Sequence, residues 1–462
     1  MKGYLTVFLA MSLSILTGFI LLLTDSAIRN AEKVRFECAV DTGMNAVLSE
    51  FHIALLERYG LIYVDASYLG REPSIANVEE RLKFYVEENT SQVFNDAYAP
   101  WGSLKEVDVV ISLSGTAADQ MGASMRNQAV CYIRDTGISG NERNVLAQKK
   151  EIQILDENDP MGEWNAVMEQ INGIELPLIL NEKGLWEEVP LSNPADWVYG
   201  LAGSDLLYLS GIDLQSVSSV HISLEDYISH RQLNNKDNEN KKYEQDEEEF
   251  LSYLFAQMGY LGNPREGSLL NCQLEYIVGG TESDWENVRI VAERLFLWRF
   301  ADNVLCALSD GNLRAQAFAA AEELQAVSQK EELKEPVAES ILYACAFIES
   351  IGDLQTIYSK GTIPVRKSSH QMSVSHVLNG NLYTTGSSSG FSYEQYLAGM
   401  ILLEKETDVN LRAMDIMEMD IRFRDGNQYF AMDWCIEWYE AGISAKGSHG
   451  AAYFIRRKYG YF

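Results

Sequence analysis

The sequence has few basic residues for its 462 positions. It holds 37 lysines and arginines against 67 aspartates and glutamates, which gives a formal net charge of −30 at pH 7. A surface of this charge repels the phosphates of nucleic acids. The sequence therefore predicts no nucleic acid among the partners of this protein.

Cysteines are also few, and they are scattered. No C-x-x-C pair is present and no histidine stands at a metal-binding spacing from a cysteine, which argues against a zinc site and against a dense disulfide framework. An even number permits disulfides in an exported protein, but apolar neighbours, as in YACAF, are typical of buried free thiols. The six cysteines are Cys38, Cys131, Cys272, Cys306, Cys345 and Cys435.

The short motifs of common catalytic sites are absent: there is no H-E-x-x-H, no G-x-S-x-G, no Walker loop and no paired glycine fingerprint. Two weaker patterns fall short of a metal site. Ser112, Ser114 and Thr116 have the spacing of a metal-dependent adhesion site, but Ser112 stands where the essential aspartate belongs. Residues 156–159 resemble a calcium loop that Pro160 interrupts. The sequence thus predicts no metal, no cofactor and no catalytic residue.

The histidines are dispersed as well. Folding could bring His370 or His376 beside a serine and an acid, which keeps a surface-exposed enzyme of the hydrolase type as the alternative interpretation. A lone histidine is more often a surface or core residue. The six histidines are His52, His221, His230, His370, His376 and His449.

Only one long hydrophobic run is present. Tyr4 to Thr24 carries no charged residue over 21 positions, and as a helix it would cover about 30 Å, the thickness of a bilayer's hydrocarbon core. Its apolar stretch exceeds the 7 to 15 residues or so of a cleaved signal, and Asp25 stands where a cleavage site needs small residues. Residues 1–24 are therefore predicted to be a retained transmembrane anchor, with a cleaved signal as the alternative.

Ala10, Ser14 and Gly18 repeat at four-residue spacing within this run. On a helix they would form one face of small residues, against which a partner helix could pack closely; the alternative is that small residues are simply common in such runs. Apolar residues then continue at helical spacing to Arg58, which predicts one unbroken helix whose residues 25–60 form a stalk. Gly43 is its weak point, at a cost of about 1 kcal/mol relative to alanine.

The rest of the chain predicts an α+β fold, with a first α+β region at 61–229, a polar loop or linker at 230–249 and a second, helix-rich region at 250–462. The loop is almost free of hydrophobic residues. Strands are expected at 61–65, 104–116, 273–280 and 430–455. Helices are expected at about 75–98, 123–134, 141–170, 250–262, 283–308, 313–329, 336–352, 392–405 and 408–424.

Segments spread over most of the chain share one resemblance. They are 2–23, 44–65, 127–133 (NQAVCYI), 274–303, 361–368 (GTIPVRKS), 391–403 and 411–423 (LRAMDIMEMDIRF). Together they resemble a Gram-positive family of uncharacterised membrane-anchored proteins, similar to the pseudopilin-like components encoded with tight-adherence pilus machinery. The resemblance implies a cytoplasmic N-terminus, an extracellular C-terminal region and other pilus subunits as partners of the N-terminal helix. It implies no catalytic residues.

The N-terminus departs from the pilin pattern at one position. In pilin-like precursors a peptidase cuts after a glycine that has a glutamate at the fifth following position. Gly3 is placed like that glycine, but Phe8 stands where the glutamate belongs. We therefore expect an uncleaved anchor in contact with the lipid bilayer, and a non-enzymatic component of a tight-adherence pilus or related surface assembly.

Overall fold

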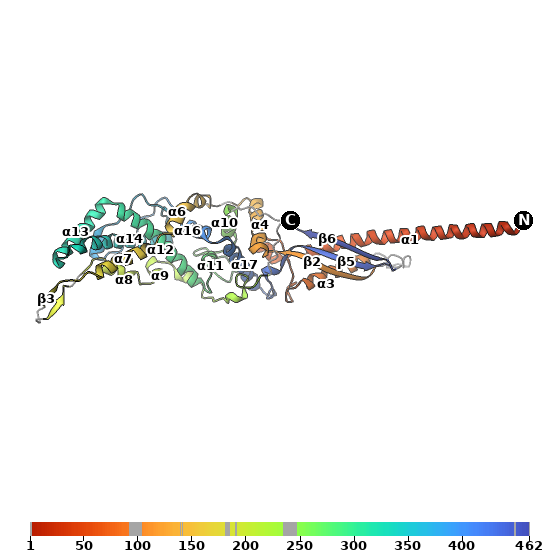
Figure 1. Ribbon diagram of the computed structural model, residues 1–462, viewed down its shortest axis with the longest axis horizontal. Coiled ribbons are helices and arrows are strands. Elements are labelled where there is room, and N and C mark those ends of the chain that lie inside the picture. Colours follow the sequence, from red (N-terminus) through yellow and green to blue (C-terminus); the bar gives the residue numbers. More distant parts are fainter. Residues whose placement is uncertain are drawn as a thin grey trace. The chain divides into compact units, whose positions relative to one another are not determined.

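The computed structural model describes residues 2–91, 104–138, 140, 142–180, 185–189, 192–233, 247–447 and 450–461. The chain forms two compact units (Figure 1). Unit 1 comprises Met1–Tyr132, Glu225–Gln245 and Ala413–Phe462, and unit 2 comprises Ile133–Leu224 and Asp246–Arg412. The predicted α+β class is confirmed, and helices predominate. The units differ from the contiguous ranges expected from the sequence, because the C-terminal segment belongs with the N-terminal one.

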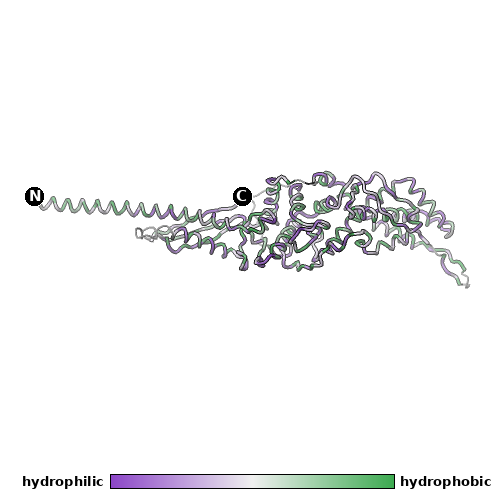
Figure 2. Tube along the Cα trace, turned by 180° about the vertical axis from the view of Figure 1, so that it is seen from behind, coloured by the Kyte–Doolittle hydropathy of each residue, from purple (hydrophilic) through white to green (hydrophobic). Residues whose placement is uncertain are grey.

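Helix α1 runs from Lys2 to Leu48, and hydrophobic residues predominate along its N-terminal part (Figure 2). The prediction of one unbroken helix to Arg58 is wrong. His52 has extended backbone angles (φ −72°, ψ 107°), and its side chain accepts a hydrogen bond from the N–H of Leu55. His52 is therefore the N-cap of a separate helix, α2 (Ile53–Tyr59).

The sheet of unit 1 is built around the C-terminal strand β5 (Cys435–Lys446). It pairs antiparallel with β2 (Lys105–Thr116), with β6 (Ala452–Gly460) and, over two residues, with β1 (Val64–Asp65). The strands predicted at 104–116 and 430–455 are confirmed, and β1 occupies the end of the one predicted at 61–65. The N–H of Gly450 donates to the carbonyl oxygen of Gly447 at 3.1 Å, which closes the hairpin of β5 and β6.

One face of this sheet is buried by the second half of α1 and by α3 (Ile75–Ser91). Alternate residues of β5, such as Tyr439 and Ile443, point into this core because strand side chains alternate between faces. Val40 and Met44 of α1 meet them and are fully buried. Residues 92–98 of the helix predicted from 75 lie outside the described residues.

Unit 2 is predominantly helical. Its two longest helices, α12 (Asp284–Ser309) and α14 (Lys334–Tyr358), pack together, and the rings of Phe296 and Phe347 lie 4.9 Å apart between them. The N-cap of α12 is Ser283, whose hydroxyl accepts a hydrogen bond from the N–H of Glu286. The unit also contains a small hairpin of β3 (Leu178–Leu180) and β4 (Trp186–Glu188).

The remaining α-helices belong to unit 2, apart from two in which the chain passes from one unit to the other. In unit 2 these are α5 (Glu142–Ala147), α6 (Lys149–Asp156), α7 (Pro160–Asn172), α8 (Asp196–Leu201), α9 (Leu206–Ser210), α10 (Glu247–Gln257), α11 (Gln273–Gly279), α13 (Gly311–Ser328), α15 (Val374–Asn379) and α16 (Tyr393–Leu403). The division between units falls within α4 (Asp119–Thr136) and α17 (Glu406–Arg422). Residues 234–246 of the predicted polar loop lie outside the described residues.

The segment 273–280 was predicted to be a strand, and it is helix α11 instead. Its β-branched and aromatic residues favour a strand locally, but six of its seven residues are buried, and tertiary packing overrides such preferences. Gly280, which follows the helix, has φ +63° and ends it as a left-handed C-cap. Gly279 and Gly280 thus mark the end of a helix.

Candidate functional site

The N-terminal half of α1 is long and apolar enough, by length and composition, to cross a membrane. None of its most apolar stretch is buried against the described parts of the chain. Four of its hydroxyl groups bond within the helix, as Ser14 does to the carbonyl oxygen of Ala10 at 2.9 Å and Thr24 to that of Ile20 at 2.8 Å. The helix therefore exposes almost no unsatisfied polar group, as an apolar surrounding requires.

The predicted packing residues Ala10, Ser14 and Gly18 all lie on this exposed part of α1. A Cβ atom added at Gly18 would meet no other atom within 4 Å, and the same holds at Gly3. The chain itself leaves this face uncovered, so it is free for a second helix. That a partner packs here, and that Gly3 is spared cleavage, stay predictions.

Beyond the apolar run, α1 enters the core of unit 1 within two to three turns. Glu32 and Phe36 are each 1% exposed. The Tyr453 hydroxyl lies 3.2 Å from the carbonyl oxygen of Arg29 and 2.8 Å from a carboxylate oxygen of Glu32. A Cβ at Gly447 would come within 2.2 Å of the same carboxylate, so the turn between β5 and β6 lies directly against the helix.

Unit 1 contains a cavity of about 380 Å³. Its lining combines apolar side chains with carboxylates and one histidine, and comprises Glu50, Phe51, His52, Ile53, Ala54, Glu57, Asp65, Tyr68, Leu69 and Asn427. This is the arrangement in which a hydrolase site would be sought. Its chemistry depends on the state of the histidine.

Both ring nitrogens of His52 are engaged. Nδ1 accepts a hydrogen bond from the N–H of Leu55 at 3.2 Å, and Nε2 lies 3.0 Å from the Oδ1 of Asn427. This pairing assigns the proton to Nε2. Burial lowers the pKa of His52, which keeps the ring neutral. As the N-cap of α2, His52 holds that helix in place. With both ring nitrogens engaged, it is poorly placed to accept a proton from a substrate.

Strained backbone borders the same cavity. Tyr68 and Leu69 have φ values of +46° and +68°, which residues with a Cβ rarely adopt. The Tyr68 hydroxyl oxygen is buried and has no hydrogen-bond partner within the described chain. Among the described residues, no serine, cysteine or lysine lines the cavity. The cavity thus has features of a binding pocket, and no described nucleophile of these three types is present in it.

A larger cavity, of about 670 Å³, lies in unit 2 beside α12. Arg289 is its main cation, and Nη1 of Arg289 lies 3.3 Å from a carboxylate oxygen of Glu293. Phe296 and Phe347 give it an apolar wall. None of the described histidines lines this cavity, so the described residues supply no general base of that type there.

Two of the other described histidines make contacts within unit 2. His370 lies 3.0 Å from the carboxylate of Asp310, but that carboxylate also caps α13 through the N–H groups of Asn312 and Leu313. The ring of His376 packs on Tyr383. His449 lies outside the described residues.

The rejected calcium-loop pattern has a structural role. Asp156 binds Arg294 at 2.8 Å and the indole N–H of Trp298 at 2.8 Å, while Asp159 caps α7 by accepting the N–H of Gly162. Ser112 lies within 3.3 Å of Glu440 on the neighbouring strand. These side chains hold helices and strands together.

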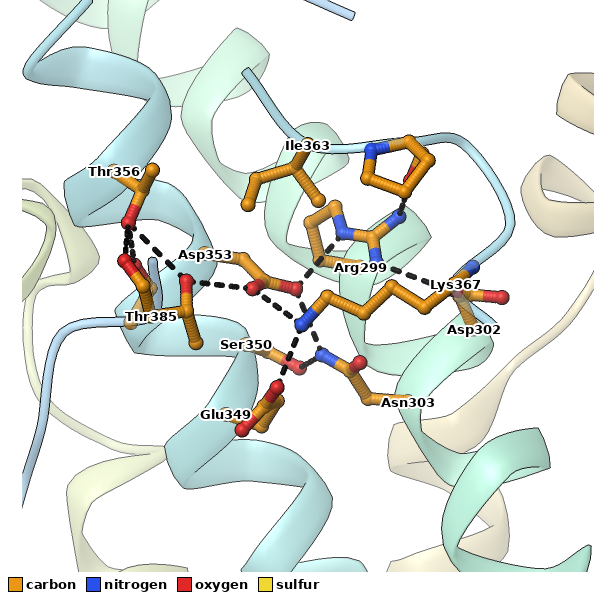
Figure 3. A network of polar contacts seen from close by, with 12 residues as sticks. Arg299, Asp302, Asn303, Glu349, Ser350, Asp353, Thr356, Ile363, Lys367 and Thr385 are labelled. Atoms are coloured by element: carbon orange, nitrogen blue, oxygen red, sulfur yellow. Dashed lines mark hydrogen bonds and ion pairs between the residues drawn. The ribbon is translucent and has the colours of Figure 1, made fainter. Parts of the chain in front are cut away.

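The polar residues that sequence reasoning missed are buried in unit 2 around Arg299 (Figure 3). Arg299 is 0% exposed and donates from Nε to Asp353 at 3.1 Å and from Nη2 to Asp302 at 2.9 Å. Its Nη1 donates to the carbonyl oxygens of Pro364 at 3.1 Å and Val365 at 3.0 Å. One guanidinium thus ties α12 to α14 and to the segment that follows α14.

Lys367 completes this network. Its ammonium lies 2.7 Å from Glu349 and 2.6 Å from Asp353, and the Thr385 hydroxyl donates to Asp353 at 2.9 Å (Figure 3). Although burial disfavours the charged form, Arg299 and Lys367 lower the pKa of Asp353, which therefore stays ionised. Losing one partner of such a network leaves a buried charge uncompensated, at a cost of about 3–5 kcal/mol.

Unit 1 buries acids on α17 in the same way. Asp420 is 0% exposed and accepts hydrogen bonds from Arg58 at 2.7 Å and from the Tyr59 hydroxyl at 2.6 Å. Glu418 is bound by Arg231 and Arg422, each at 2.5 Å. Acids spaced among methionines and isoleucines, as in MDIMEMD, were the signal in the sequence that these positions face inward.

Glu275 in α11 is a buried acid without a basic partner among the described residues. It accepts hydrogen bonds from the Tyr393 hydroxyl at 2.7 Å and the N–H of Leu261 at 2.8 Å, and its Oε2 has no partner. Burial raises the pKa of Glu275 to about 7. Neither of the two cavities described above includes this carboxyl, whose hydrogen bonds connect α11 to Tyr393 and to Leu261.

All six cysteines are free, and Cys38 on α1 is exposed. Burial raises the pKa of Cys345 to about 12, which makes that thiol unreactive.

Residues 184–447 match a family of unknown function (DUF5702). The chain belongs to this family. The matched range holds the segments around Glu275, Arg299, Lys367 and Asp420, and the apolar run of α1 lies outside it. The chain matches no curated protein and no solved structure. The family match therefore covers most of the buried polar networks.

Proposed function

We propose that this protein is a non-enzymatic, membrane-anchored component of a tight-adherence pilus or related surface assembly. The observation that carries the proposal is the N-terminal half of α1, an apolar helix of membrane-spanning length with no cover from the described chain. An apolar helix that has no other part of its chain packed against any face needs lipid or other helices around it. The orientation proposed, with the N-terminus cytoplasmic and both units extracellular, rests on the family resemblance.

Two further observations support an architectural role. The anchor continues without a break into the core of unit 1, so a force on the helix acts directly on the folded unit. The small-residue face of Ala10, Ser14 and Gly18 is open along the anchor. We propose that neighbouring subunits of the assembly pack on this face.

The test is crosslinking within the membrane. Gly18→Leu adds bulk to the proposed packing face, and Ser12→Leu adds comparable bulk on the opposite face of the same helix. We expect Gly18→Leu to reduce captured partners several-fold and Ser12→Leu to leave them unchanged. Equal capture by both variants and the parent, or a strictly monomeric protein in all three, would contradict packing through this face.

The exposed thiol of Cys38 tests the orientation, because it lies beyond the apolar run. A membrane-impermeant maleimide should label Cys38 in intact cells, and Cys38→Ser should lose that label. Labelling only after lysis would place unit 1 on the cytoplasmic side and remove the surface assembly from consideration.

The alternative is a surface enzyme, and the described cavity that combines a histidine with carboxylates is that of unit 1, lined by His52, Asp65 and Glu57. The engaged ring of His52 argues against it. His52→Gln keeps a hydrogen-bonding side chain there, and loss of a hydrolase activity in that variant of the folded protein would favour the enzyme.

A further inference from the structure

The hairpin of β3 and β4 exposes an unusual amount of apolar surface. The exposed fractions are 58% for Leu178, 43% for Ile179, 57% for Leu180, 63% for Leu185 and 69% for Trp186. In Figures 1 and 2 the hairpin extends away from the helices of unit 2. A two-stranded ribbon is only marginally stable in water by itself. Neighbouring apolar side chains on such a ribbon mark a contact surface.

The two faces of the hairpin are not equivalent. Leu180 lies opposite Trp186, and Leu178 lies opposite Glu188, so these side chains share one face. Ile179 and its opposite neighbour Glu187 share the other. The first face therefore carries the larger apolar side chains.

The two edges of the hairpin also differ. Strand β4 reads Trp-Glu-Glu, and charged residues are a common protection of an exposed strand edge. Strand β3 reads Leu-Ile-Leu, carries no charge and pairs within the described chain only with β4. Its outer N–H and C=O groups are thus available to another strand, and its side chains offer no electrostatic barrier.

We propose that β3 pairs with β3 of a second copy of this chain, antiparallel and about a two-fold axis at Ile179. The four strands would then run β4, β3, β3 and β4. With Ile179 on the axis, Leu178 of each copy lies opposite Leu180 of the other. One face of the resulting sheet gathers Leu178, Leu180 and Trp186 from both copies, and three or more strands with an apolar face are stable where two are not.

The self-complementary, uncharged edge of β3 points to a second copy as the occupant. Two chains of −30 repel each other over most of their surfaces, so self-association needs an uncharged strand at the contact. The Leu-Ile-Leu edge is both uncharged and complementary to itself, as a two-fold contact requires. The glutamates of β4 end up on the two outer edges, where they oppose addition of further strands. The inference deepens the proposed function, because it assumes that copies meet in one membrane.

Disulfide formation at the axis tests the pairing in the full chain reconstituted in lipid vesicles. Directly opposed residues of antiparallel strands have Cα atoms about 4.5–5.5 Å apart, within the range of about 4.4–6.8 Å that a disulfide needs. Ile179→Cys should therefore give a disulfide-linked dimer on mild oxidation, above the background of the parent chain. Glu187→Cys is the matched control, because the two β4 strands would lie about 14 Å apart, three strand spacings.

A second substitution tests the apolar edge. Adding Leu180→Lys to Ile179→Cys should lower the yield of linked dimer at least ten-fold, because it places two ammonium groups within the contact. The side chain at position 180 is exposed, so the change leaves the core of unit 2 intact.

The outcomes separate the pairing of β3 strands from the packing of partners on the Gly18 face of α1. Equal dimer yields from Ile179→Cys and Glu187→Cys, no yield above the parent, or an adduct with a protein of different mass would overturn β3 pairing. If Leu180→Lys abolishes the Ile179→Cys dimer while capture through the Gly18 face persists, both proposals stand. If β3 pairing fails while that capture persists, only the present inference is lost.

Discussion

The two halves of α1 belong to one uninterrupted helix but have opposite surroundings. Tyr4 to Thr24 is apolar on every side, and all of its residues are exposed. From Glu32 to Leu48 the helix is amphipathic, and one stripe, including Val40 and Met44, is fully buried against the sheet and α3. The second half finds its apolar surroundings within the chain, whereas the first half must find them outside it.

This difference changes the meaning of residues 25–60, which the sequence predicted as a stalk. The Tyr453 hydroxyl already meets α1 at Arg29 and Glu32. From Thr24 to Glu32 the axial distance is roughly 12 Å at 1.5 Å per residue. Most of the presumed stalk is therefore a core element of unit 1, and the folded unit begins within about two turns of the apolar run.

The largest expected effect comes from a charge in the buried half. Val40→Asp would place a carboxylate without a partner in the core, and the free energy of unfolding should fall by more than about 4 kcal/mol. Val34→Asp is the control on the same helix, since Val34 is 60% exposed, and should change it by about 0.5 kcal/mol or less. Denaturant unfolding of the full chain in detergent, followed by tryptophan fluorescence, measures both. Similar losses in the two variants would mean that α1 is not part of the core.

The same kind of change in the exposed half should act on a different property. Leu16→Arg places a charge at the centre of the apolar run, which costs about 2.5–3.5 kcal/mol of membrane insertion. We expect a large loss of protein from the carbonate-washed membrane fraction, with Leu16→Ala as the control, and an unchanged unfolding midpoint of unit 1. Full retention of Leu16→Arg in the membrane would show that the run is not the anchor.

The contact where the two halves meet should be sensitive to one methyl group. At Gly447 a Cβ would lie 2.2 Å from the buried carboxylate of Glu32. Gly447→Ala should lower the unfolding free energy by about 1–3 kcal/mol, as overpacking does. Gly426, where a Cβ meets nothing within 4 Å, is less suitable as a control because its φ is +85°. Gly311→Ala, at an open position without positive φ, is the better control and should show no such loss.

The smallest effect is expected from removing one hydroxyl. Tyr453→Phe deletes the group that binds Glu32 and Arg29, and should cost about 1 kcal/mol. Burial, together with the hydrogen bond to Glu32, raises the pKa of Tyr453 to about 12. Because the folded state holds the hydroxyl proton of Tyr453 more tightly, the stabilisation that this hydroxyl provides is complete below about pH 10. It is lost as pH rises through 12.

The difference in unfolding free energy between the parent and Tyr453→Phe should therefore shrink between about pH 10 and pH 12. A difference that stays constant from pH 9 to pH 12 would show that the hydroxyl does not anchor the turn to α1.

Local patterns predicted much of the fold. The apolar periodicity over residues 283–308 predicted α12, and the alternation over residues 104–116 predicted β2. The strand predicted at 273–280 failed because a seven-residue segment is too short for its periodicity to separate a buried helix from a strand. The helix predicted to Arg58 failed because His52 caps a new helix with its side chain, an uncommon cap.

Some residues of the candidate functional sites were predicted from the sequence, and others were not. The structure places Ala10, Ser14 and Gly18 on the exposed helix, as the apolar run requires, and their packing stays a prediction. The buried networks around Arg299 and Asp420 were not predicted, because each joins residues from distant parts of the chain, such as Arg58 with Asp420. No strand was predicted for the exposed β3–β4 hairpin, since three-residue strands carry almost no periodic signal.

The sequence by itself determined the apolar run, the α+β class and the absence of common catalytic motifs, because these depend on composition and on patterns within a few residues. Only the tertiary structure decided that β5, near the end of the chain, pairs with β1 and β2 near its beginning. It also decided that the helix after the run is a core element. Both outcomes depend on which distant surfaces bury each other, and no local pattern specifies such partners.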